Sequence, residues 1–167
     1  MPIVSAGILL YRGEPAELEV FIARMGGPFW AKKDDRAWSV PKGLLEGDED
    51  ALVAARREFR EEIGVDAPPL DYALLGDFRQ RSGKVVRVFV ARADSPGAPA
   101  GAATLAFASS NTFSTEWPPR SGRQQEFPEI ADARWLPLAE AARKLVAGLV
   151  PALDALQTLL DAGATSD

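Results

Sequence analysis

Apolar residues near the N-terminus are arranged as in paired β-strands. Residues 3–11 form an almost continuous apolar run, which is typical of a buried strand. Turn-forming residues follow at 12–15 and residues 18–25 alternate in part, so we expect the two runs to form a hairpin. Residues 26–37 mix Gly, Pro and charged residues, which predicts a loop, and residues 38–40 predict a short strand.

The period of the apolar positions changes from strand-like to helical after residue 48. Residues 41–48 contain a Pro and two Gly residues and are expected to form a loop. The following segment predicts a helix from about 49 to 63, with Asp48 as its N-cap and Gly64 at its end.

The next part of the chain returns to strand patterns. Residues 72–81 and 84–93 predict a second hairpin around a Ser-Gly pair. The segment 94–110 is biased towards Ala, Gly, Pro and Ser, which predicts a long and mobile loop. Residues 112–117 predict a further strand that ends at a Pro-Pro pair.

The C-terminal segment predicts one more short strand and two helices. The apolar pair Trp135-Leu136 marks the expected start of the strand. Residues 138–146 and 151–161 have amphipathic helical patterns, and the second has Pro in its first turn. The positions expected to form the buried stripe of the second helix are Leu153, Leu156 and Leu160.

The helix that follows residue 48 concentrates acidic residues on one face. Glu58, Glu61 and Glu62 stand at i, i+3 and i+4, so they share one side, whereas Phe59 and Ile63 fall on a neighbouring stripe that can be buried. Carboxylates within one turn repel one another, so a helix built only for stability avoids them. Hard cations such as Mg²⁺ prefer oxygen ligands, which makes this cluster a candidate metal site. The alternative is a solvated acidic face.

A long spaced signature surrounds these carboxylates. It reads Gly, five residues, Glu, seven residues, Arg-Glu, an apolar residue, any residue, Glu-Glu, any residue, Gly and an apolar residue. Its defined positions are Gly43, Glu49, Arg57, Glu58, Phe59, Glu61, Glu62, Gly64 and Val65. The stretch resembles the Nudix box without departure at any defined position. Because each polar position matches by chance about once in 10–20 trials, accidental agreement is negligible.

The resemblance implies a fold, an activity and a metal. Nudix hydrolases are α/β proteins with a mixed β-sheet sandwiched between α-helices, and they cleave a nucleoside diphosphate linked to another group. We therefore expect residues 1–167 to form a single Nudix hydrolase domain. The implied cofactor is Mg²⁺, with Mn²⁺ as a substitute. The implied reaction is attack of metal-activated water on a phosphoanhydride bond.

The resemblance also assigns roles within the box. The expected metal ligands are the side chains of Glu58, Glu61 and Glu62 and the backbone carbonyl of Gly43. One of the three carboxylates can also act as the base on the attacking water. Arg57 stands four residues before Glu61 and can orient its carboxylate. Glu49 is expected to be a structural partner of an arginine or of the loop rather than a ligand.

A later loop offers one more carboxylate. Nudix proteins often carry such a residue six positions before a Trp that opens the last strand, and Glu129 stands six positions before Trp135. Glu126 is the close alternative for this metal ligand. The alternative role for Glu129 is a solvated loop carboxylate.

Four residues outside the helix are candidates for substrate contacts. They are Trp30, Lys42, Arg120 and Arg123. Trp30, beside Lys32 and Lys33, can stack on a base, or it can cover the sheet edge. Residues 122–127 are loosely similar to a segment of diadenosine polyphosphate hydrolases in which basic and Gln residues meet the phosphate chain, although Glu126 departs from that pattern. For the three cations, surface salt bridges are the alternative role.

Composition limits the other classes of function. The 167 residues are 47% apolar and 26% charged, as in globular proteins. A formal net charge of −5 and a pI near 4.9 disfavour broad binding to nucleic acid or to anionic membranes. The chain has no Cys and no His, which excludes thiolate zinc sites and histidine bases. The N-terminus lacks the basic region of a signal peptide, and no apolar run approaches a membrane span, so we expect a cytoplasmic location.

Three functions compete on this evidence. The first is a Mg²⁺-dependent hydrolase whose small-molecule substrate is a nucleoside polyphosphate or a dinucleoside polyphosphate. The second is a Nudix-fold sensor that binds a nucleotide without turnover, which the complete box disfavours. The third is an RNA 5′-end pyrophosphohydrolase, which the acidic charge balance disfavours. The sequence leaves the oligomeric state open.

Overall fold

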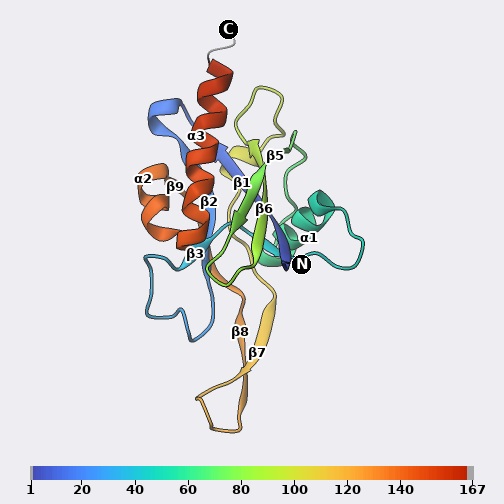
Figure 1. Cartoon of the computed structure of the whole chain (residues 1–167), viewed down its shortest axis with the longest axis vertical. Coiled ribbons are helices and arrows are strands. Elements are labelled where there is room, and N and C mark those ends of the chain that lie inside the picture. The colour runs from blue at the N-terminus through green and yellow to red at the C-terminus, as the bar shows by residue number, and fades with distance from the viewer. Residues whose placement is uncertain (1, 165–167) are drawn as a thin grey trace.

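The sheet is organised around its first strand, β1 (Val4–Arg12) (Figure 1). In the computed structural model, which describes residues 2–164, β1 runs antiparallel to β2 (Glu19–Met25) and parallel to β6 (Val85–Arg92). The other strands of this seven-stranded mixed sheet are β3 (Trp38–Ser39), β4 (Lys42–Leu44), β5 (Ala73–Arg79) and β9 (Ile130–Pro137). A separate two-stranded ribbon pairs β7 (Thr112–Glu116) with β8 (Gln124–Pro128). Both predicted hairpins are confirmed.

Helices cover both faces of the sheet. On one face lies α1 (Ala51–Ile63), and on the other lie α2 (Leu138–Lys144) and α3 (Val150–Ala164) (Figure 1). Short 3₁₀ turns occur at Pro15–Glu17, Ala102–Thr104 and Ala147–Leu149. The predicted α/β arrangement of a mixed sheet between helices is therefore confirmed. Within residues 2–164, no helix is both long and apolar enough to span a bilayer.

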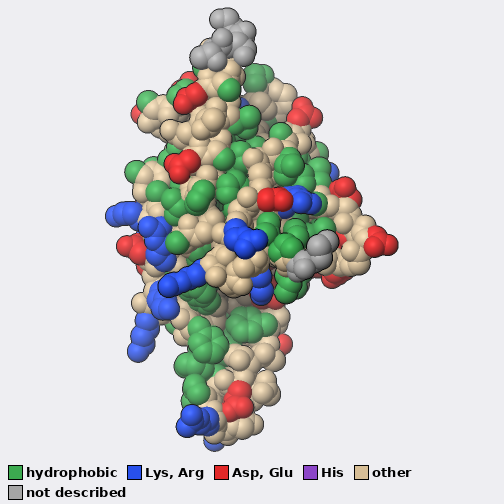
Figure 2. All heavy atoms as spheres, viewed as in Figure 1, with side chains coloured by type: hydrophobic (Ala, Val, Ile, Leu, Met, Phe, Trp, Pro, Cys, Tyr) green, Lys and Arg blue, Asp and Glu red, His purple; other side chains and the backbone are tan. Residues whose placement is uncertain are grey.

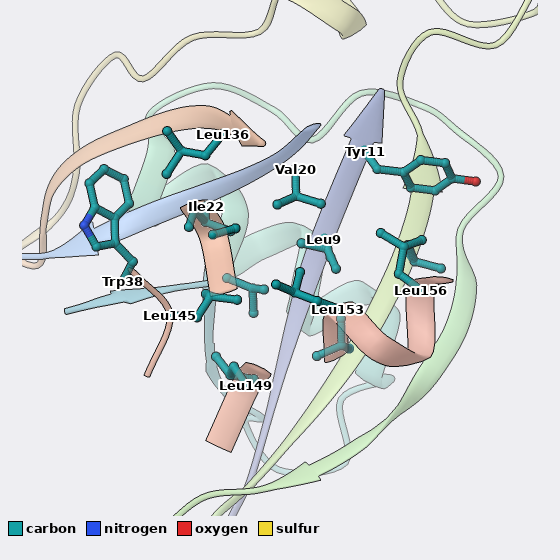
Figure 3. Close-up of a cluster of buried hydrophobic side chains, with 14 of the residues drawn as sticks. Leu9, Tyr11, Val20, Ile22, Trp38, Leu136, Leu145, Leu149, Leu153 and Leu156 are labelled. Atoms are coloured by element: carbon teal, nitrogen blue, oxygen red, sulfur yellow. The ribbon is translucent and has the colours of Figure 1, made fainter. Parts of the chain in front are cut away.

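Alternation along β1 divides the interior into two cores. Leu9 packs on the side of α3 with Leu153 and Leu156 (Figure 3). Ile8 faces the opposite side and packs with Phe59 of α1. Burial of each such side chain contributes about 1.5–3 kcal/mol. The buried stripe predicted for the last helix is confirmed, with Leu160 partly buried at its end. The sheet thus holds α1 rigidly from one side and the C-terminal helices from the other.

The box helix begins two residues later than predicted. Asp50, not Asp48, is its N-cap, because the Asp50 carboxylate accepts hydrogen bonds from the N–H groups of Leu52 at 3.1 Å and Val53 at 3.2 Å. Gly64 ends the helix as predicted, with a left-handed φ of 85° and an N–H that donates to the carbonyl of Arg60.

Three further predictions of secondary structure are corrected. The expected loop at 41–48 contains the short strand β4, which pairs with β1. The ribbon strand β8 was not expected, because its sequence contains Gln, Glu and Pro and a single large apolar residue. The last strand begins at Ile130 rather than at Trp135, since it pairs with β2 over its whole length.

The segment 94–110 is a loop, as predicted, but it is packed against the protein. Leu105 and Phe107 contact the core beside α1. The indole N–H of Trp135 donates to the carbonyl of Leu105 at 2.9 Å, and the N–H of Ala108 donates to the carbonyl of Ile63. These contacts do not favour the mobility that its composition suggests.

Candidate active site

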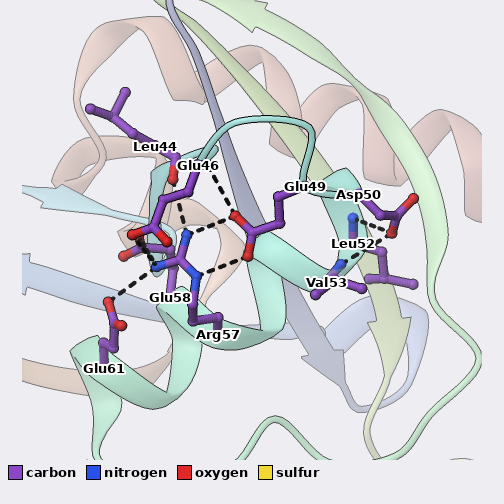
Figure 4. A network of polar contacts seen from close by, with 9 residues as sticks. All are labelled: Leu44, Glu46, Glu49, Asp50, Leu52, Val53, Arg57, Glu58 and Glu61. Atoms are coloured by element: carbon purple, nitrogen blue, oxygen red, sulfur yellow. Dashed lines mark hydrogen bonds and ion pairs between the residues drawn. The ribbon is translucent and has the colours of Figure 1, made fainter.

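Arg57, in the middle of α1, is the centre of a polar network that reaches back to the loop before the helix (Figure 4). Its guanidinium binds both carboxylate oxygens of Glu49, with Nε at 2.9 Å and Nη2 at 3.0 Å. Nη1 donates to Glu58 at 2.8 Å and to Glu61 at 3.4 Å. The hydrogen bonds that Arg57 donates to Glu49 raise the pKa of Arg57 and lower the pKa of Glu49. Glu49 is therefore a partner of arginine, and Arg57 contacts Glu61, both as expected.

Gly43 leaves room for the carboxylate of Glu58. A Cβ atom built at Gly43 would overlap Cδ and both carboxylate oxygens of Glu58. Pairing of Gly43 with Ala6 fixes β4 against β1, and α1 packs on both strands. The two box residues, which lie 15 positions apart in sequence (58 − 43 = 15), are thus in direct contact. A glycine is required here by space rather than by backbone conformation.

Glu62 is a buried carboxylate. Only 4% of its surface is exposed, and its Oε1 accepts a hydrogen bond from the backbone N–H of Lys42 at 2.9 Å. Burial of a charged group is unfavourable unless it is paired. β4 therefore meets α1 twice, at Glu58 through Gly43 and at Glu62 through Lys42.

Burial shifts the ionisation of these two carboxylates. Desolvation raises the pKa of Glu62 to about 7, opposed by Lys42 and reinforced by the negative charges of Glu58 and Glu129. Desolvation also raises the pKa of Glu58, against the hydrogen bond from Arg57 and with the charges of Glu61 and Glu129. Glu129 thus lies close enough to act on both groups. The result is a desolvated acidic site in which negative charge is poorly compensated.

This donor set fits a divalent cation. Among residues 2–164, no three acidic side chains are already gathered in the arrangement of a metal cluster, and Arg57 bridges Glu58 and Glu61. The argument for a cation therefore rests on the chemistry of these side chains and not on a preformed cluster. Carboxylate oxygens are the ligands that Mg²⁺ prefers, and a cation would offset the charge that burial leaves uncompensated at Glu58 and Glu62.

A cleft joins the acidic helix to two of the four predicted substrate residues, Trp30 and Lys42. Its volume is about 270 Å³. The residues that line it are Met25, Gly26, Trp30, Lys42, Glu62, Phe113, Glu129 and Ile130. Four residues predicted from the sequence to act on the substrate or metal therefore share one cavity. Glu129 lines this cleft, whereas Glu126 lies within the ribbon and accepts a hydrogen bond from Thr112 at 3.2 Å.

Trp30 has contacts that suit both of its predicted roles. It packs against the core under α2 and α3, and it also lines the cleft. Lys33 places its Nζ 5.5 Å from the centre of the Trp30 ring. Phe113 of β7 was missed as a site residue, although its place in the alternating strand pattern marks it as the inward-facing residue. The cleft thus has an aromatic residue on each of two segments that are distant in sequence.

The loop that carries Trp30 is tied to α2. The backbone of Arg36 has a φ of 60°, and its guanidinium donates to the carbonyls of Ala142 at 2.5 Å and Leu145 at 3.0 Å. Asp34 pairs with Lys144 and accepts the indole N–H of Trp38 at 2.9 Å. The last carbonyls of a helix lack partners within it, so Arg36 satisfies them while it fixes the loop. None of these anchors was identified from the sequence.

Arg120 and Arg123 lie on the ribbon rather than among the carboxylates. The ribbon extends away from the sheet, and both residues are exposed near its tip (Figures 1 and 2). Arg120 is in the connecting turn, with a φ of 62°. Their predicted contacts with phosphate stay predictions, since the structure groups neither residue with the cleft.

Comparison with known protein families identifies the family to which this chain belongs. The family model for the NUDIX domain matches residues 1–156. The chain belongs to the Nudix family. This Nudix protein is also 41% identical over 56 residues to an RNA pyrophosphohydrolase of Halorhodospira halophila. That match covers 33% of this chain and 30% of the relative, so the chain aligns with less than a third of that protein.

Solved Nudix structures share the fold along almost the whole chain. An Ap4A hydrolase from C. elegans, in a binary complex, aligns with a TM-score of 0.61 and 18% identity over 95% of this chain and 98% of its own. The NUDIX domain of NrtR from Shewanella oneidensis, complexed with ADP ribose, aligns with a TM-score of 0.60 and 15% identity over 96% and 89%. At these identities the similarity establishes the fold, and the predicted membership of the Nudix family is confirmed.

Proposed function

We propose that this protein is a Mg²⁺-dependent Nudix hydrolase that cleaves a phosphoanhydride bond in a nucleoside polyphosphate or a dinucleoside polyphosphate. One observation carries the proposal. The cleft places Trp30, which can stack on a base, in one cavity with Lys42, Glu62 and Glu129. A base, a phosphate chain and a cation thus each find suitable groups in one cavity.

One group of side chains would bind the metal, and another group would bind the substrate. When bound, a divalent cation would neutralise phosphate oxygens and make water more acidic. Glu58, Glu61 and Glu62, with the carbonyl of Gly43 and with Glu129, would hold it. Arg57 orients Glu58 and Glu61 through its hydrogen bonds at 2.8 and 3.4 Å.

The substrate side of the cleft is contributed by other elements. Lys42 projects from β4 at the cleft, where its ammonium can neutralise phosphate. Trp30 offers its ring to a base. Mn²⁺, which carboxylate ligands also suit, would replace Mg²⁺ at the acidic side chains. The complete box favours turnover over a role as a nucleotide sensor.

Removal of metal should abolish activity. We expect no phosphate release in EDTA and recovery with Mg²⁺ or Mn²⁺, measured on nucleoside triphosphates, nucleotide sugars, dinucleoside polyphosphates and RNA with a 5′ triphosphate. Mg²⁺ should also raise the melting temperature, since a ligand at a hundredfold excess over Kd adds about 2.7 kcal/mol to the free energy of unfolding. Full turnover in chelator would rule out the mechanism, and turnover of the RNA alone would replace the proposed substrate class.

Replacement of Trp30 tests its contact with the base. Trp30→Ala should raise KM for nucleotides by about tenfold, because stacking contributes roughly 1–3 kcal/mol per base. The value of kcat should hold, since the carboxylates of α1 are not touched. Melting of the variant is the control. A lower melting temperature with an unchanged KM would show that Trp30 only covers the core.

A further inference from the structure

The β7–β8 ribbon has two chemically different faces. The register pairs Phe113 with Phe127 and Thr115 with Gln125, so these side chains share one face. The ring centres of Phe113 and Phe127 lie 6.2 Å apart. The N–H of Trp117 donates to the carbonyl of Arg123, which places the next pair on the same face. The opposite face is formed by Thr112, Ser114, Glu116, Gln124, Glu126 and Pro128.

Charge is separated between these faces in the same way. Both carboxylates of the ribbon, Glu116 and Glu126, lie on the polar face. Arg123 lies on the aromatic face, where no carboxylate of the ribbon stands. An anionic ligand is therefore favoured on the aromatic face, in a protein whose net charge is −5.

The aromatic face is directed towards the loop that carries Trp30. A Cβ atom built at Gly27 would come within 2.7 Å of the Phe113 ring, so ribbon and loop are in contact. Further out, Phe29 and Trp117 form an edge-to-face pair with ring centres 5.7 Å apart. Phe29 is 62% exposed, so its ring is open to solvent beside Trp117. Figure 2 shows apolar side chains along the ribbon, outside the body of the protein.

This outer pair continues the cleft. Phe113 lines the cleft, and Trp117, directly after the end of β7, stands four residues further along the chain, a distance of about 14 Å at roughly 3.4 Å per residue of extended chain. Phe29 directly precedes Trp30, which also lines the cleft. Aromatic rings thus line the cleft, at Trp30 and Phe113, and also the region outside it, at Phe29 and Trp117. Arg123 lies beside the outer pair.

We propose that Phe29 and Trp117 form a second base-stacking site, which takes a second nucleobase joined through phosphate to the one in the cleft. Arg123 is the cation for the phosphate that links them. The inference rests on the proposed function of the cleft and extends it to the choice of substrate. A two-stranded ribbon is only marginally stable alone in water. A base stacked on this pair would contact both ribbon and loop and hold both in place.

Paired substrates test the second site. Trp117→Ala should raise KM for diadenosine tetraphosphate by about tenfold, because one stacked base is lost, and should leave KM for adenosine tetraphosphate unchanged. Arg123→Ala should show the same selectivity. Ser114→Ala, on the polar face of the same strand, is the control and should behave as wild type. A 5′-triphosphorylated RNA dinucleotide, assayed in parallel, identifies whether the second base comes from a dinucleoside polyphosphate or from an RNA end.

The proposal is overturned if Trp117→Ala changes KM equally for one-base and two-base substrates, or changes neither. Calorimetry with a methylene-bridged diadenosine tetraphosphate and Mg²⁺ separates this result from failure of the proposed function. If the wild-type protein hydrolyses no nucleotide, weaker binding of the analogue by the Trp117 variant still supports the second site. Equal binding by both proteins contradicts it.

Discussion

Glu62→Gln is expected to lower kcat by several orders of magnitude while leaving the metal-free protein at least as stable as wild type. The amide keeps the acceptor for the N–H of Lys42, which lies 2.9 Å from Oε1. It removes a negative charge that is 96% buried (100 − 4) and that faces Glu58 and Glu129. Removal of this charge relieves repulsion in the apo protein but weakens the binding of a cation. Phosphate release and thermal melts in EDTA and in Mg²⁺ measure the two effects.

Glu46→Gln provides the matched control. Glu46 is an exposed carboxylate that also pairs with Arg57, at 3.7 Å, but it is not a predicted ligand. Its replacement should leave both turnover and the Mg²⁺-induced rise in melting temperature close to wild type. Wild-type turnover in the Glu62 variant would remove this residue from the set of metal ligands.

Gly43→Ala is expected to reduce activity by about a hundredfold through displacement of Glu58. The added methyl group overlaps the Glu58 carboxylate, so either β4 or the side chain has to move. A displacement of about 1 Å at a catalytic group is sufficient for an effect of this size. Overpacking should also lower the free energy of unfolding by about 1–3 kcal/mol. Kinetics at saturating Mg²⁺ and urea titration are the measurements.

Gly97→Ala is the control that separates steric overlap with a neighbouring side chain from the mere replacement of a glycine by alanine. A Cβ atom at Gly97 meets no atom within 4 Å, so this variant should match wild type in activity and stability. If Gly43→Ala retained full activity, the contact with Glu58 would have no role in positioning the carboxylate.

Local sequence patterns predicted most of the sheet strands and the box helix, because each of these has a regular period of its own. β1 is buried on both faces and α1 has a complete signature, so neither needed knowledge of the rest of the chain. The helix start was misplaced because Asp48 and Asp50 are both good N-caps, and only backbone geometry selects Asp50. The strand β8 was missed because its pairing with β7 depends on a partner and not on its own composition.

The site was predicted in part for the same reason. The carboxylates of α1 are neighbours in sequence, whereas Phe113 reaches the cleft only through tertiary structure. The sequence could not decide whether Glu129 or Glu126 is the additional candidate ligand, because this depends on which of them faces the cleft in the folded protein. The anchors of the loop, Asp34 and Arg36, contact residues more than 100 positions away, so no local pattern could reveal them.

The attachment of the Trp30 loop to α2 means that the two parts of the proposed site are held from opposite faces of the sheet. The carboxylates are held by α1 and β4 on one face of the sheet, whereas Arg36 and Asp34 fasten the loop to the helices on the other face. Substitutions at the end of α2 are therefore expected to reshape the proposed base pocket without contacting the proposed metal ligands.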